Sequence, residues 1–160
     1  MGHSAGAHMA ALLALDRDYL VRAGVRPDCI VGLVGLSGPY ALEPNTTALR
    51  SIFSPPFTPG DWQPVRFASE RSPATLLLQG LDDRVVNPDH ARKLREALER
   101  RGVAVETLFY PGRGHGDTIA SFSGIGRHRT PALAQTVVFL ERVTRGRSAD
   151  VTSLGSGLKH

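Results

Sequence analysis

Three residue types that together can carry out nucleophilic catalysis follow one another along this chain. Ser4 is the centre of Gly2-His3-Ser4-Ala5-Gly6, a G-x-S-x-G pattern that precedes an Ala- and Leu-rich stretch. Asp82 and Asp83 follow the apolar run ATLLLQG, and His115 lies in a Gly-His-Gly triplet after VETLFYPG. A serine hydroxyl becomes a good nucleophile when a base removes its proton, and imidazole can do this near neutral pH. A carboxylate can fix the tautomer of that imidazole.

Each of these residues has an ordinary alternative role when it is taken alone. Ser4 could cap the helix that follows it. Asp82 and Asp83 could both be solvated turn residues, and His115 could be a loop histidine without a chemical role. The catalytic interpretation is favoured because all three types occur in one chain. The aspartates and the histidine also each come directly after an apolar run.

The other histidines are weaker candidates for a base. His3 and His8 belong to the pentapeptide and to the helix after it, so we expect them not to face the Ser4 hydroxyl. His90 lies in a charged helical segment and His128 between two arginines, which predicts surface positions for both. No cluster of His, Cys and Asp has the spacing of metal ligands. We therefore expect no metal and no cofactor.

Helices and strands alternate along the chain and would position the candidate residues. The pattern predicts a parallel sheet with flanking helices, which is α/β architecture. In such sheets, functional sites assemble at the carboxyl ends of the strands, where Asp83 and His115 would lie. The predicted elements are a helix over 5–20, strands over 29–38, 74–80 and 103–112, a helix over 88–102 and a closing helix over 130–144.

One long segment interrupts this alternation. Residues 39–73 contain seven of the eleven prolines together with Trp62 and three phenylalanines. We expect irregular structure there with short helical pieces, either as a lid or binding wall or as a poorly ordered insertion. Residues 1–145 are therefore predicted to form one domain with a lid-like insertion at about 39–73. The polar, Gly- and Ser-rich segment 146–160 is predicted to be a disordered tail.

The composition narrows the class of protein. The 160 residues, 41% hydrophobic and 21% charged, are typical of one globular domain. The net charge is +4, but the arginines are scattered among acidic residues, so we do not expect a nucleic-acid partner. No apolar run is long enough to span a membrane and no signal peptide is recognisable. Cys29, the single cysteine, is expected to be buried at the start of a strand. We expect a cytoplasmic protein, and nothing in the sequence specifies its oligomeric state.

Four segments of the chain resemble the C-terminal half of an α/β-hydrolase. The resemblance extends from about Gly2 to Thr144, and it is closest to the esterase and lipase group. This group includes carboxylesterases, acetyl-xylan and feruloyl-type esterases, and kynurenine formamidases. The segments are GHSAGAHMAALLALD, GLSGPY, SPATLLLQGLDDRVVNPDHARKLREAL and VETLFYPGRGHGD.

The resemblance implies roles for the candidate residues. It makes Ser4 the nucleophile and His115 the base, in the chain order Ser, Asp, His of that fold. The acid of this group follows the glycine that closes its strand by three positions, which selects Asp83 after Gly80 over Asp82. The backbone N–H of Ala5 would be one donor of the oxyanion hole. The implied substrate is a small-molecule carboxylic ester. An arylformamidase-like amidase and a catalytically inactive hydrolase fragment remain as alternatives.

The chain also departs from the family pattern. The three predicted strands all follow the elbow, and neither the strand before it nor the upstream His-Gly-Gly type oxyanion motif is recognisable. We therefore expect a partial α/β-hydrolase fold that lacks the N-terminal strands, as in the downstream part of a longer hydrolase. A chain of this kind would expose a sheet edge and an apolar face, and we expect it to be unstable and weakly active by itself.

Overall fold

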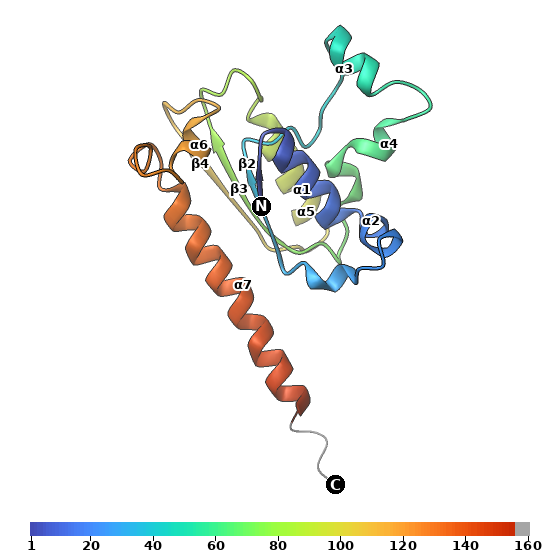
Figure 1. The fold of residues 1–160 in the computed structure, drawn as a ribbon, viewed down its shortest axis with the longest axis vertical. Coiled ribbons are helices and arrows are strands. Elements are labelled where there is room, and N and C mark those ends of the chain that lie inside the picture. The colour runs from blue at the N-terminus through green and yellow to red at the C-terminus, as the bar shows by residue number, and fades with distance from the viewer. Residues whose placement is uncertain (156–160) are drawn as a thin grey trace.

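The computed structural model describes the backbone of residues 1–155 and the side chains of residues 1–145. Its centre is a parallel sheet in which four strands lie in chain order (Figure 1). The strands are β1 (Gly2–His3), β2 (Gly32–Leu36), β3 (Ala74–Gly80) and β4 (Val105–Tyr110). Each neighbouring pair is parallel, so the chain crosses over a face of the sheet between strands. The predicted α/β class is confirmed.

Helices cover both faces of the sheet. On one face lie α1 (Ala5–Leu15) and α5 (Asp89–Glu99), while α7 (Ala132–Gly155) runs along the other (Figure 1). Alternate residues of β3 contribute to the cores on the two faces of the sheet. Leu77 packs in the cluster with α1 and α5, whereas Leu76 and Leu78 pack in the cluster with α7. This alternation is the period of two expected of a strand buried on both sides.

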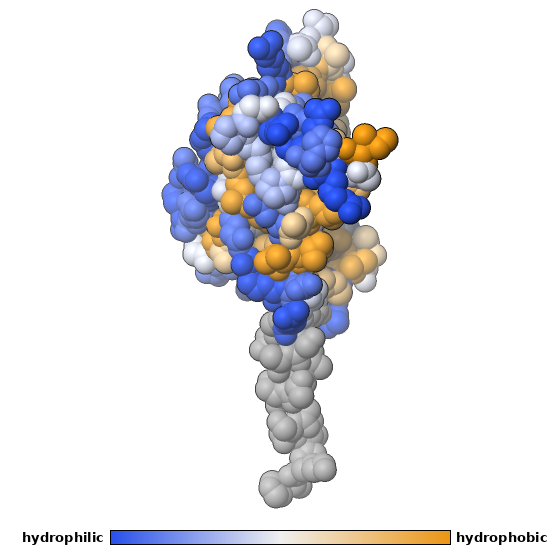
Figure 2. Space-filling view, turned by 90° about the vertical axis from the view of Figure 1, so that its left-hand side faces the viewer, coloured by the Kyte–Doolittle hydropathy of each residue, from blue (hydrophilic) through white to orange (hydrophobic). Residues whose placement is uncertain are grey.

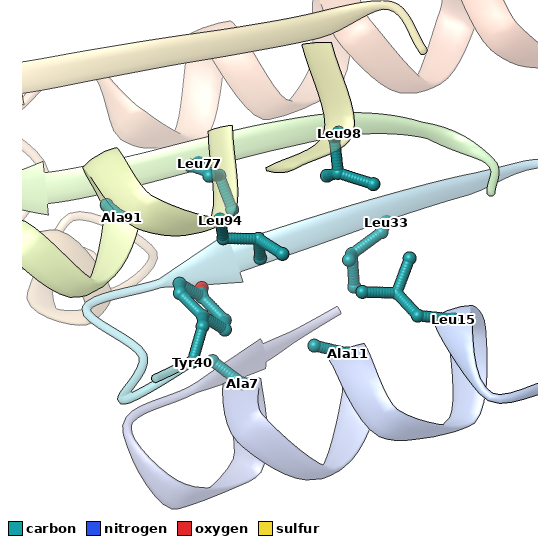
Figure 3. Packing of buried hydrophobic residues seen from close by; sticks show 9 residues of the cluster. All are labelled: Ala7, Ala11, Leu15, Leu33, Tyr40, Leu77, Ala91, Leu94 and Leu98. Atoms are coloured by element: carbon teal, nitrogen blue, oxygen red, sulfur yellow. The ribbon is translucent and has the colours of Figure 1, made fainter. Parts of the chain in front are cut away.

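The core beneath α1 and α5 is made of small and branched apolar side chains. Tyr40 lies between the two helices and is 1% exposed (Figure 3). Alanines on α1 allow this helix to approach the sheet closely, whereas leucines on α5 fill the wider space on its side. The cluster consists of Ala7, Ala11, Leu15, Leu33, Tyr40, Leu77, Ala91, Leu94 and Leu98.

A short strand precedes the serine, contrary to the sequence-based expectation. Gly2 and His3 pair with Gly35 and Leu36 of β2, and the N–H of Ser4 donates to the Leu36 carbonyl at 2.9 Å. Two residues show no periodicity, so only the long-range pairing with β2 reveals this strand.

On the outer side of α1, Met9 and Leu13 are 62% and 44% exposed.

Three local expectations were wrong. The first predicted helix ends at Leu15, because Asp16 caps a separate helix, α2 (Arg17–Arg22), by accepting from the N–H of Asp18. Strand β2 begins at Gly32 rather than at residue 29. Cys29 ends a short 3-10 helix, η1 (Pro27–Cys29), and is exposed instead of buried, because Pro27 starts that turn outside the sheet.

The proline-rich segment 39–73 contains three short helical pieces. They are α3 (Thr47–Ile52), α4 (Pro59–Trp62) and the 3-10 helix η2 (Pro64–Phe67). Helix α3 projects well beyond the helices that cover the sheet (Figure 1). The base of the segment is fixed, since the Val65 N–H donates to the Tyr40 carbonyl and the Gln63 amide to the Leu42 carbonyl.

The C-terminal helix extends further than the predicted 130–144. It continues to Gly155, through the first part of the predicted tail, and residues 156–160 lie outside the described residues. From the side of α7 and the loops after β4, hydrophilic and hydrophobic residues alternate over the surface (Figure 2). Exposed apolar side chains on this helix are Val137, Val138 and Leu140. Among the described residues, none of the helices has the length and apolar character needed to cross a membrane.

Candidate active site

Ser4 occupies a sharp turn between β1 and α1. Its backbone has φ 55° and ψ −124°, in the left-handed range that residues other than glycine rarely adopt. The turn is tight enough that a Cβ atom on Gly2 would lie 2.2 Å from the carbonyl oxygen of Gly6. This strained strand-to-helix turn is the geometry of a nucleophile elbow, which presents a serine hydroxyl above the end of a sheet.

The structure brings the three predicted catalytic side chains together. The Oγ of Ser4 lies 2.9 Å from Nε2 of His115, and Nδ1 of the same ring lies 2.8 Å from Oδ2 of Asp83. Asp83 follows β3 by three residues and His115 lies in the loop after β4, so both come from the carboxyl ends of neighbouring strands. Parallel strands thus place side chains that are distant in sequence at one edge of the sheet.

Asp83 is a fully hydrogen-bonded carboxylate. Its side chain is 0% exposed, and its oxygens accept from the N–H groups of Val85 and Val86, the Gln79 amide and the His115 ring. Burial raises the pKa of Asp83, but these four hydrogen bonds together outweigh burial and hold the pKa below its usual value. The group is therefore ionised at neutral pH.

An ionised Asp83 fixes the tautomer of the neutral His115 ring. A carboxylate only accepts hydrogen bonds, so the proton must be on Nδ1 of His115. Nε2 then carries a lone pair directed at the Ser4 hydroxyl, and that hydroxyl donates to it. The His115 side chain is 18% exposed, so the ring is largely buried but not sealed from solvent. In this arrangement His115 can accept the proton of the Ser4 hydroxyl and later donate it to a leaving group.

The loop that carries His115 packs directly against the end of β3. A Cβ atom on Gly80 would lie 2.3 Å from the carbonyl oxygen of Arg113, and the Asp82 N–H donates to that same carbonyl. The glycines on either side of His115 are not crowded in this way. A Cβ on Gly114 would make only ordinary contacts, and one on Gly116 would meet no described atom within 4 Å other than those of its chain neighbours.

The other sequence candidates lie in different surroundings. The Ala5 N–H is in the first turn of α1, where backbone N–H groups have no acceptor within the helix. Asp82 is exposed, whereas His8 is buried and its Nε2 donates to the Trp62 carbonyl at 2.6 Å. His90 is partly buried rather than on the surface, because its Nδ1 accepts from the Ala41 N–H.

Two contributors to the site were missed by sequence reasoning. Gln79 is the penultimate residue of β3, and its side-chain amide donates to Oδ2 of Asp83 at 3.0 Å. His3 contacts the backbone of His115. A polar residue at an otherwise apolar strand end was the available signal for Gln79. For His3, position in the pentapeptide gave no indication of the partner, which is 112 residues away.

Ser4 and Ala5 line a cavity of about 620 Å³. One wall comes from segment 39–53, including Leu42, Leu49 and Phe53, and the other from 85–93, including Val86 and Lys93. Phe53 is supported from behind by the Trp62 ring, with ring centroids 4.6 Å apart. The lining therefore places apolar surface beside the serine, together with several polar and charged side chains. Within residues 1–145, no three His, Cys, Asp or Glu side chains are grouped so that they could hold a metal ion.

Comparison with known sequences identifies one protein family. The profile of the prolyl oligopeptidase family matches residues 1–147. Among curated proteins, no sequence is significantly similar to this chain.

Solved structures of similar fold include several esterases. A carboxylesterase from Lactobacillus plantarum superposes with a TM-score of 0.69 at 18% identity, over 88% of this chain and 56% of its own. A propionate-bound thermophilic esterase from Thermogutta terrifontis gives 0.64 at 19%, over 88% and 52%. An acetyl ester-xyloside bifunctional hydrolase from Caldicellulosiruptor lactoaceticus gives 0.59 at 20%, over 96% and 55%. The chain thus spans about half the length of these structures and shares their fold over that part.

Proposed function

This chain belongs to the prolyl oligopeptidase family and has part of the α/β-hydrolase fold, and from this premise we propose that it is a serine hydrolase of carboxylic esters. The observation that carries the proposal is the continuous hydrogen-bonded series from the Ser4 hydroxyl through the His115 ring to the Asp83 carboxylate. These three types in this order supply a nucleophile, a base and a group that orients the base.

In the proposed reaction, Ser4 attacks the ester carbonyl. Its Oγ bonds to the carbonyl carbon while its proton passes to Nε2 of His115. The carbonyl electrons move to the oxygen, and the Ala5 N–H donates to the resulting oxyanion. When the tetrahedral intermediate collapses, the alcohol leaves with the proton from His115, and Ser4 remains acylated.

Water completes the cycle by the same route in reverse. His115 takes a proton from the water molecule as its oxygen attacks the acyl carbon, and then returns that proton to the Ser4 oxygen as the acid departs. Asp83 stays ionised throughout and stabilises the imidazolium that forms in each half of the reaction. Its four hydrogen bonds keep its oxygens in place for this task.

The cavity supports a small substrate with an apolar part. Leucine, valine and phenylalanine side chains beside Ser4 favour binding of an apolar part through buried area. Polar and charged side chains of the same lining, including Glu43, Asn87 and Lys93, can orient the rest of the ligand. The esterases of similar fold support a carboxylic ester as the first choice. The family matched by the sequence includes peptidases by its name, which supports a small amide as the second candidate.

Labelling with a fluorophosphonate tests the proposal without knowledge of the substrate. We expect one adduct on Ser4, read by intact mass, and its loss in Ser4→Ala. Turnover of a short-chain aryl ester, formylkynurenine and a prolyl anilide then separates ester from amide preference. Folded chain that gives neither an adduct nor turnover of any of the three would support the inactive alternative and overturn the proposal for this chain.

A further inference from the structure

The residue before the nucleophile contacts the loop that carries the base. Nε2 of His3 lies 2.9 Å from the backbone carbonyl oxygen of His115. The two imidazole rings are also neighbours, with centroids 4.7 Å apart and planes inclined at 47°. The His3 side chain therefore makes two contacts with His115, a hydrogen bond to the backbone carbonyl of His115 and a contact with its ring.

The direction of this hydrogen bond follows from the groups involved. A carbonyl oxygen only accepts, so Nε2 of His3 carries the hydrogen and donates it. With its N–H bound to the carbonyl, the His3 ring is held in one orientation against the His115 ring. It is not a second base, because the nitrogen in contact with the Ser4 hydroxyl belongs to His115.

The backbone of His3 is itself firmly held. His3 pairs with Leu36 in the sheet, and the N–H of Ser4 donates to the Leu36 carbonyl at 2.9 Å. The dipeptide His3-Ser4 is thus anchored on β2 by the backbone of both its residues. The His3 side chain reaches the backbone of His115, and the Ser4 side chain reaches the His115 ring.

Other contacts hold the flanks of the His115 loop. The Gly114 N–H donates to Asp117 at 2.7 Å, and the Arg113 carbonyl accepts from the Asp82 N–H at 3.0 Å. These bonds fix the residues before His115 and the start of α6 (Asp117–Ala120). The bond from His3 acts at His115 itself, where a small rotation of the peptide would swing Nε2 away from Ser4.

We propose that His3 is a positioning residue that sets the distance between the His115 imidazole and the Ser4 hydroxyl. The inference rests on the proposed function, since it assigns His3 a part in the same reaction. His3 acts through the carbonyl and ring of His115 and does not touch the substrate. The x position of the G-x-S-x-G pentapeptide would then require a side chain with an N–H donor at the reach of Nε2.

Two substitutions separate the donor from the ring. His3→Phe keeps a ring against His115 but has no donor, whereas His3→Gln has no ring but offers an amide N–H near the position of Nε2. His128→Gln, on an exposed loop, is the matched control. For each variant we would measure the rate of Ser4 labelling by a fluorophosphonate, kcat and KM for a short-chain aryl ester, and thermal unfolding.

We expect His3→Phe to lower the labelling rate and kcat by about tenfold to a hundredfold with KM unchanged, because a displaced base slows proton removal. His3→Gln should recover most of this loss, and His128→Gln should match the wild type. Labelling of His3→Phe at the wild-type rate would overturn the proposal. An equal loss in His3→Gln and His3→Phe, with both folded, would also overturn it.

The design also covers two other failures. If His3→Phe does not unfold cooperatively, His3→Met supplies an apolar side chain without a donor and is compared with His3→Gln in the same way. If Ser4→Ala still turns over the ester, the proposed function fails, whatever His3 does. If Ser4→Ala is inactive and the His3 variants are fully active, only the inference about His3 fails.

Discussion

The backbone of Arg113 closes against Gly80, so that a Cβ atom on Gly80 would lie 2.3 Å from the Arg113 carbonyl oxygen. The strand that leads to Asp83 and the loop that leads to His115 therefore touch through their backbones. We expect the 2.8 Å contact between Asp83 and His115 to depend on this approach. Substitutions at the glycine test that dependence directly.

Gly80→Ala should displace the His115 loop. The added methyl group meets backbone atoms that cannot rotate away, and overpacking of this kind costs about 1–3 kcal/mol. We expect a lower melting temperature and slower fluorophosphonate labelling of Ser4. Gly116→Ala is the control, since no described atom other than those of its chain neighbours lies within 4 Å of its Cβ position. Equal melting temperatures and labelling rates for the two variants would show that the loop does not rely on Gly80.

The two glycines of the pentapeptide should respond in opposite ways. A Cβ on Gly2 would lie 2.2 Å from the Gly6 carbonyl oxygen, whereas a Cβ on Gly6 would meet no described atom within 4 Å beyond its chain neighbours and the backbone of its own helix. Gly2→Ala should therefore distort the elbow and abolish labelling of Ser4. Gly6→Ala should preserve labelling and stabilise α1 by up to about 1 kcal/mol, because alanine favours a helix more than glycine. Denaturant unfolding and labelling of both variants check this, and a destabilised Gly6→Ala would contradict it.

Asp83→Asn should leave the fold in place but remove most activity. An amide in this position can donate to Nδ1 of His115 and so stabilise the tautomer that cannot accept the Ser4 proton. We expect kcat for an aryl ester to fall by about three to four orders of magnitude. Asp82→Asn, at the exposed neighbouring position, should leave kcat unchanged. A large loss of kcat in Asp82→Asn with an unchanged kcat in Asp83→Asn would show that Asp82, not Asp83, orients the base.

Stability should decline on mild acidification because His8 is held neutral. Burial lowers the pKa of the His8 imidazole below 6.5, and the hydrogen bond to the Trp62 carbonyl only partly opposes this effect. Below 6.5 the unfolded chain binds more protons than the folded one. The contribution of His8 is therefore complete above pH 6.5 and is lost as pH falls through the lower, folded pKa.

Urea unfolding between about pH 7.5 and pH 5 measures this contribution. The unfolding free energy of His8→Gln should depend less steeply on pH than that of the wild type. Burial also lowers the pKa of His90, so some dependence should remain. Parallel curves for His8→Gln and the wild type would show that His8 is not protonated on unfolding in this range.

Features recorded in local sequence patterns could be predicted. The alternation of helices with apolar strands indicated the parallel sheet, and the resemblance to α/β-hydrolases is confirmed by the family match and by the fold. The resemblance to the family, in which the acid follows the strand-closing glycine by three positions, implied Asp83 rather than Asp82. The structure places Asp83 against His115, while Asp82 is exposed. Strand-end position was informative because parallel strands deliver their carboxyl ends to one edge.

Features that arise from long-range contacts could not be predicted. Strand β1 has two residues and exists through its pairing with β2, and the partner of His3 is a backbone carbonyl 112 residues away. The local sequence also does not show which glycines lie where a side chain would clash. Gly80 is crowded by Arg113, whereas Gly116, beside the histidine, is not crowded by any described atom.

The sequence separation of 111 between Ser4 and His115 has a consequence for the synthesis of the protein. Ser4 leaves the ribosome before His115, so its hydroxyl has no base until β4 has been synthesised and has joined β3. Contacts between residues this far apart close late and slowly in folding. Reactivity of Ser4 therefore reports completion of the sheet, and a nascent chain that stops before β4 would be chemically silent although its elbow were already formed.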